Sequence, residues 1–180
     1  MPLGDQAAIA VLGNAAPDLA EETAEAARQL GRTLAAAGYA LAVLGADGVA
    51  AAVAGGAREA RGEVLAVVPK GEEATYEAAH TVDATDALAG MRVVLDAADA
   101  IVMVEADLTS LALALQVWAY GLTPAAPYRQ VVFVGPRWQE TIAAVAAAAN
   151  LDARTRAMVS FAEDPSQIVD IVRFYVAPGG

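Results

Sequence analysis

Short apolar runs alternate with longer mixed segments along this chain. The runs are rich in Val, Ile and Leu and contain almost no polar positions, as expected for strands buried on both faces of a parallel sheet. Five of them span Ala8–Leu12, Tyr39–Leu44, Val64–Val68, Ala100–Val104 and Val131–Val134, and Met158–Phe161 is a weaker sixth run. The pattern predicts a sheet of about six strands.

The segments between the runs carry apolar residues at helical spacing. In the first segment Ala27, Leu30 and Leu34 lie three or four residues apart, and Gly38 provides a stop signal. The predicted helices span Leu19–Ala37, Gly48–Ala60, Ala84–Ala97, Leu108–Tyr120, Gln139–Ala149 and Pro165–Val176. Strands that alternate with helices predict an α/β protein with a Rossmann-like, doubly wound parallel sheet in three layers, α/β/α. We expect residues 1–180 to form one such domain.

Composition narrows the functional classes. The chain has no cysteine, which excludes disulfides, thiolate catalysis and cysteine-bound zinc. It has no uninterrupted apolar stretch of about 18 residues and no visible signal peptide, so we expect a cytoplasmic protein without a membrane partner. Its net charge is −11. This charge predicts that nucleic acid is not a partner, since a phosphate backbone would be repelled.

Two loops after predicted strands carry glycines where a ligand of an open α/β sheet would bind. Gly13 and Asn14 follow the first strand, and the segment from Gly45 to Val49 follows the second. A glycine after a strand permits a tight turn and lets a phosphate approach backbone N–H groups. An ordinary strand-to-helix turn is the alternative. The chain lacks a GxGxxG motif, which disfavours a dinucleotide-dependent dehydrogenase.

An ordered set of features resembles a known family. Gly48-Val49, then Gly56-Ala57, then a strand ending at Pro69 follow one another, after the segment Ile9–Asn14. Roughly residues 7–135 are similar in this way to LOG-type (LONELY GUY) proteins. That group includes cytokinin-activating phosphoribohydrolases and molybdenum-cofactor carrier proteins, and it is related to the DNA-processing A proteins. The resemblance implies a nucleotide or other small phosphorylated ligand and a homodimer or higher homo-oligomer.

The chain departs from the family's catalytic motifs. The hydrolases carry an Arg before the fourth strand and a Pro-Gly-Gly-x-Gly-Thr-x-x-Glu motif after it. In this chain only Thr109 survives from the second motif, Ala112 stands at the Glu position and Gly90 at the Arg position. Arg92 is about two residues out of register. We therefore predict binding without catalytic residues, with a nucleoside 5′-monophosphate phosphoribohydrolase and a non-catalytic structural or interaction subunit as the alternatives.

Three carboxylates surround the expected phosphate position. Asp107 is placed to cap the helix that follows the fourth strand, which would fill that position, and Glu105 and Asp47 add negative charge. The three could instead bind Mg²⁺, but we favour two caps and a solvated side chain, and assign no metal site. The residues predicted to contact the ligand are Gly13, Asn14, Gly45, Asp47, Gly48, Val49, Thr109 and Ser110.

Other polar and aromatic residues are less specific. Arg137 could hold an anion, whereas Trp138 is expected to pack on the following helix rather than stack on a base. Lys70 is expected to be a solvated loop residue, and His80, the only histidine, an isolated surface residue. Trp118 is expected in the core; an exposed aromatic and leucine stripe on its helix would instead suit a subunit interface.

Overall fold

The computed structural model describes residues 3, 6–104, 107–123 and 129–176. Within these residues, seven parallel strands form one sheet in the order β4-β3-β2-β1-β5-β6-β7. The strands are β1 Ala8–Leu12, β2 Ala40–Leu44, β3 Val64–Pro69, β4 His80–Ala84, β5 Ala100–Val104, β6 Gln130–Val134 and β7 Val159–Ala162. The helices are α1 Glu21–Ala36, α2 Val49–Glu59, α3 Ala87–Ala97, α4 Leu108–Gly121, α5 Pro136–Ala148, α6 Ala153–Arg156 and α7 Pro165–Tyr175.

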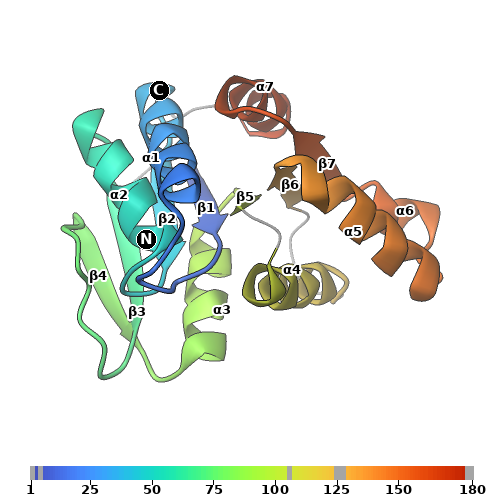
Figure 1. Cartoon of the computed structure of the whole chain (residues 1–180), viewed down its shortest axis with the longest axis horizontal. Coiled ribbons are helices and arrows are strands. Elements are labelled where there is room, and N and C mark those ends of the chain that lie inside the picture. The colour runs from blue at the N-terminus through green and yellow to red at the C-terminus, as the bar shows by residue number, and fades with distance from the viewer. Residues whose placement is uncertain (1–2, 4–5, 105–106, 124–128, 177–180) are drawn as a thin grey trace.

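Helices cover both faces of the sheet, which gives the predicted three-layer α/β/α fold (Figure 1). On one face α1, α2 and α7 pack through residues such as Leu30, Val53 and Ile168. On the other face α3, α4 and α5 contribute Met91, Trp118 and Trp138 to a second layer of the core. Apolar burial on both faces explains why the central strands contain almost no polar residues.

The strand order reverses between β1 and β5. The chain runs from β1 outward to β4, then returns to place β5 on the free side of β1, where Ala10 pairs with Ile101. On its other side Ala10 pairs with Ala42 of β2. The loops that follow β1 and β5 therefore diverge to opposite faces of the sheet, and the space between them is a topological switch point.

The structure adds two elements that the sequence did not predict, β4 and the short helix α6. Four of the five residues of β4 are exposed or half-buried, because β4 is an edge strand, so it lacks the apolar run typical of a buried strand. The predicted start of the third helix, at Ala84, was wrong. Ala84 ends β4, and α3 begins at Ala87 after Asp86, whose side chain accepts a hydrogen bond of 2.9 Å from the Ala89 N–H.

Helices α1 and α2 approach each other through glycines. A Cβ on Gly56 would lie 1.8 Å from the backbone oxygen of Arg28, and one on Gly31 would lie 2.2 Å from the backbone oxygen of Val53. Glu59 of α2 accepts hydrogen bonds from both Arg28 and Arg32 of α1 at the rim of this contact. The Gly56-Ala57 pair, part of the family resemblance, thus has a helix-packing role.

None of the helices within the described residues has both the length and the apolar character needed to cross a bilayer.

Candidate functional site

A hydrogen bond bridges the switch point. The Asn14 side-chain amide, in the loop after β1, donates to Oδ2 of Asp107 at 2.6 Å. The other oxygen of Asp107 accepts from the backbone N–H of Ser110 at 2.7 Å, which caps α4. The predicted capping role of Asp107 is confirmed. A carboxylate of the protein itself thereby occupies the helix N-terminus that would attract a phosphate.

The loops after β1 and β2 pack directly against each other. The Val49 N–H donates to the backbone oxygen of Asn14 at 2.8 Å, and the Gly48 N–H donates to Oδ1 of Asp47 at 2.8 Å. Gly48 has φ 63°, and a Cβ there would lie 2.4 Å from the Asn14 oxygen. A Cβ on Gly13 would lie 2.8 Å from a Val49 methyl group, and one on Gly45 at 2.8 Å from Cβ of Ala15. These glycines allow the two loops to meet, and the amides of Gly48 and Val49 are already hydrogen-bonded.

Tyr76 fixes the second loop, a role that the sequence did not indicate. Its hydroxyl donates to the backbone oxygen of Gly45 at 2.7 Å, and the neighbouring Thr75 donates to the oxygen of Ala46 through both its hydroxyl and its N–H. Burial, and to a smaller extent the nearby charge of Asp47, raise the pKa of Tyr76 above its usual value. A lone tyrosine in a polar segment carries no sequence signal for this contact.

The start of α4 combines an exposed and a buried hydroxyl. Thr109 is exposed, whereas Ser110 is fully buried and its Oγ has no hydrogen-bond partner among the described residues. Buried polar groups are normally hydrogen-bonded. This hydroxyl therefore has unused hydrogen-bonding capacity next to the Asp107 cap.

A pocket of about 310 Å³ lies at the same edge of the sheet, between the start of α1 and the turn from β6 to α5. Glu22 and Thr23 line it from α1, and Gly135 and Arg137 line it from the turn. Arg137 is exposed and forms no ion pair with any described residue. The N-cap of α5, Gly135, supplies no side-chain hydrogen bond to the helix. Because β6 neighbours β5 and α1 follows β1, this pocket adjoins the switch point.

Both tryptophans lie in the core, as predicted for Trp118, and Trp138 lies within α5 rather than before it. Trp138 is fully buried, with its ring centroid 4.7 Å from that of Phe133. Trp118 is also buried, and its indole N–H donates to the backbone oxygen of Thr155 at 3.1 Å. Leucines of the same helix are exposed, by 83% at Leu108 and 40% at Leu115, so the stripe on the α4 surface is aliphatic and not aromatic.

The positions of the family's catalytic groups hold no acid or base. Ala112 is exposed on α4, and Gly90 is buried where a Cβ would lie 2.8 Å from a Leu44 methyl group. Arg92 lies on the surface of α3 with its Nε 3.8 Å from Asp96. These positions offer no group for glycosidic-bond cleavage.

The other charged candidates are dispersed. Asp47 accepts from its neighbour's amide and Asp107 caps α4, whereas Glu105 lies outside the described residues. No cluster of three or more metal-binding side chains occurs in the described part of the chain. Lys70 is exposed after β3. His80, predicted as an isolated surface residue, is exposed on β4.

Solved structures share this fold. The molybdenum cofactor carrier protein of Chlamydomonas reinhardtii superposes with a TM-score of 0.72 at 22% identity, over 96% of this chain and 99% of that chain. The molybdenum cofactor binding protein of Rippkaea orientalis gives a TM-score of 0.74 at 16% identity, over 94% of this chain and 96% of that chain. At such identities the likeness establishes the fold alone.

A third relative corrects one prediction. The DNA processing protein A of Helicobacter pylori, whose structure is described in terms of its single-stranded DNA binding mode, superposes with a TM-score of 0.60 at 14% identity. The match covers 97% of this chain and 84% of that chain. The prediction that nucleic acid is excluded as a partner was therefore wrong, because net charge describes the whole molecule, whereas binding depends on the local charge of one surface.

Sequence comparison identifies the family more directly. No curated protein matches the chain. Residues 6–120, which include β1 to β5 and nearly all of α4, match the SLOG cluster4 family. This agrees with the LOG-like resemblance at the level of the wider family and not at the level of the LOG enzymes. The chain belongs to the SLOG cluster4 family.

Proposed function

We propose that this protein binds a small phosphorylated ligand, such as a nucleotide, at the carboxyl edge of its sheet without hydrolysing it. The observation that carries the proposal is the pocket beside the switch point, which is lined by an exposed Arg137 without an ion-pair partner among the described residues. Ligands of open α/β sheets bind at this position.

Arg137 is the group that would hold the phosphate. A guanidinium recognises phosphate through paired hydrogen bonds, and the positive end of the α5 helix dipole lies at the same turn. The local cation matters because the protein carries a net charge of −11, which repels a free anion at long range.

The Asn14 and Asp107 pair would face the uncharged part of the ligand. The Asp107 carboxylate can accept hydrogen bonds from ligand hydroxyl or amino groups, and Asn14 holds its orientation. The exposed Thr109 adds a hydroxyl at the same helix start. The predicted contacts through Gly48 and Val49 N–H groups receive less support, since both already have partners.

Binding without hydrolysis follows from the catalytic positions. Cleavage of an N-glycosidic bond needs a carboxylate that stabilises an oxocarbenium-like transition state or activates water. The family position of that carboxylate is Ala112. The two structural neighbours named for the molybdenum cofactor support a small ligand as the kind of molecule bound, and at 22% and 16% identity they do not specify which ligand this chain binds.

The test is thermal unfolding with inorganic phosphate and with nucleoside mono-, di- and triphosphates, each with and without Mg²⁺. A ligand at 100 times its dissociation constant stabilises by about 2.7 kcal/mol, which is a rise of roughly a few degrees in Tm. Arg137→Ala should abolish the rise. Arg154→Ala, in α6 before β7 and so at the opposite edge, should leave it intact.

The outcomes separate the alternatives. No rise with any compound, or an equal rise in Arg137→Ala, would contradict the proposal. Release of free base from a nucleoside monophosphate would favour the phosphoribohydrolase. A rise that requires Mg²⁺ would show that a cation joins the carboxylates of the site.

A further inference from the structure

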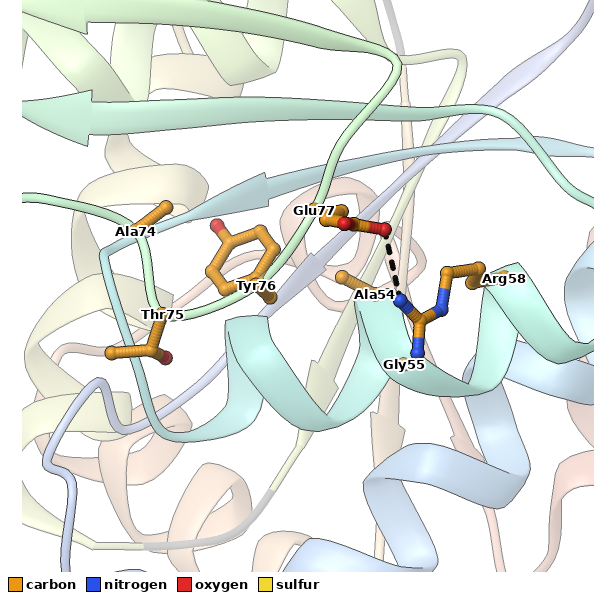
Figure 2. A pocket seen from close by; sticks show the side chains of 7 residues that line it. All are labelled: Ala54, Gly55, Arg58, Ala74, Thr75, Tyr76 and Glu77. Carbon is orange, nitrogen blue, oxygen red and sulfur yellow. Dashed lines mark hydrogen bonds and ion pairs between the residues drawn. The ribbon is translucent and has the colours of Figure 1, made fainter.

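A second pocket lies away from the switch point, on the side of α2 that faces the β4 edge of the sheet. Its volume is about 440 Å³, and it is lined by α2 and the segment that leads from β3 to β4. A smaller pocket of about 230 Å³ shares Ala54, Arg58 and Glu77 with it, so the two form one groove along α2. Figure 2 shows α2 on one side and residues 74–77 on the other.

Gly55 gives this groove its depth. A Cβ on Gly55 would meet nothing within 4 Å, whereas one on the adjacent Gly56 would collide with α1. A glycine inside a helix is less favourable than alanine, and packing explains Gly56 but not Gly55. The space that a side chain at Gly55 would occupy belongs to the groove, where a ligand can lie against the helix backbone.

Two oppositely charged side chains, Arg58 and Glu77, lie at the rim of the groove. Nη1 of Arg58 lies 2.9 Å from Oε2 of Glu77, and Figure 2 shows the two side chains meeting across the groove. Their side chains are 68% and 83% exposed, so the pair is weak and can rearrange at little cost. Tyr76 forms a wall whose position is fixed, because its hydroxyl is hydrogen-bonded to Gly45.

We propose that this groove binds a small zwitterion, a free amino acid or dipeptide, with its carboxylate on Arg58 and its ammonium group on Glu77. A ligand with one charge would leave either Arg58 or Glu77 without its partner. A zwitterion replaces one exposed ion pair with two, and its remaining atoms lie between Gly55 and the Tyr76 ring. The site is separate from the switch-point site, so either proposal can fail alone.

The test is isothermal titration and thermal unfolding of the full chain with the standard amino acids and with simple dipeptides. One or more of these should bind, and N-acetylation or C-terminal amidation of the same compound should weaken binding by about tenfold or more, because each removes one charge of the ligand. Absence of binding by all of them, or equal binding of the capped forms, would overturn the proposal.

Two variants locate the site. Gly55→Ala should raise Tm without ligand, because alanine favours the helix, and should reduce the affinity about tenfold or more, because the methyl group enters the groove. A stabilising substitution that weakens binding cannot be explained by misfolding. Arg58→Gln should also weaken binding, whereas Arg154→Gln should not. Unchanged affinity in both Gly55→Ala and Arg58→Gln would overturn the assignment to this groove.

Discussion

The side-chain amide of Asn14 and the carboxylate of Asp107, 93 residues apart in sequence, form a hydrogen bond of 2.6 Å. The bond joins the loop that leaves β1 to the start of α4, across the point where the sheet reverses its strand order. Asp107 simultaneously caps α4 through the Ser110 N–H. One carboxylate therefore stabilises a helix and holds the two sides of the candidate site together.

We predict that Asn14 and Asp107 are energetically coupled. Asn14→Ala should lower the free energy of unfolding by about 1–2 kcal/mol, because it removes the hydrogen bond to the charged Asp107 and the one that Asn14 accepts from the Ala16 N–H. Asp107→Ala should cost about 2–3 kcal/mol, because it removes that bond and the helix cap. The double variant should cost about 1 kcal/mol less than the sum of the two, as measured by urea unfolding.

Asp86→Ala is the matched control for this cycle. Asp86 caps α3 through the Ala89 N–H and has no hydrogen bond to Asn14. Its loss should cost about 1 kcal/mol, the usual value for a cap, and should add to Asn14→Ala without coupling. Strict additivity of Asn14→Ala and Asp107→Ala would show that the bridge contributes nothing to stability.

The sequence predicted the elements that have a clear apolar pattern and missed β4 and α6, which lack one. The central strands were found because burial on both faces requires apolar runs, whereas β4 is an exposed edge strand with the sequence HTVDA. The cap at Asp107 was predictable because an aspartate directly before a helix commonly accepts a hydrogen bond from an N–H of the first turn, a contact between residues close in sequence. Its bond to Asn14 was not, because it depends on which strands become neighbours.

The role of the glycines at the candidate site could likewise be predicted only in part from the sequence. Gly13 and Gly48 were predicted to approach a phosphate, and in the structure each also lies where a Cβ would collide with the neighbouring loop. The sequence pattern is identical in both cases, because the requirement for a missing Cβ does not specify what fills the space.

Acid should weaken the protein partly through Asp164. Hydrogen bonds from Ser166 and from the Gln167 N–H hold the pKa of Asp164 below its ordinary value of 3.8. A carboxyl whose folded pKa is lowered contributes stability above the unfolded pKa, and this contribution is lost as the pH falls through the folded pKa. Asp164→Asn should therefore lose less stability than the wild type between about pH 5 and pH 2, as measured by urea midpoints. An equal or steeper loss in Asp164→Asn would contradict this.

Gly48→Ala should destabilise the protein at the loop contact. Gly48 has φ 63°, which alanine adopts only under strain, and a Cβ would lie 2.4 Å from the Asn14 oxygen and 2.7 Å from the Ala15 carbonyl carbon. Strained backbone costs about 1–3 kcal/mol per residue, and the clash adds to this. Guanidinium unfolding should show a loss of at least about 2 kcal/mol. The control is Gly71→Ala. Gly71 has φ 93°, but a Cβ there would meet nothing within 4 Å, so this variant measures the cost of backbone strain without the cost of a clash.

Adjacent glycines in α2 should respond to alanine with opposite signs. Gly56→Ala places a methyl group 1.8 Å from the Arg28 oxygen of α1, so the helices must separate and the Glu59 contacts to Arg28 and Arg32 must shift. Overpacking of this kind costs about 1–3 kcal/mol, and a clash with backbone leaves little room to relax. Gly55→Ala meets no neighbouring atom and should stabilise the helix by about 0.5–1 kcal/mol.

The two variants have the same composition, and the substituted residues are adjacent in the same helix. A difference of about 2 kcal/mol or more between their unfolding free energies would therefore measure the α1–α2 contact directly. Similar stabilities would show that α1 and α2 can move apart freely, and the close glycine contact would then not be a constraint on this fold.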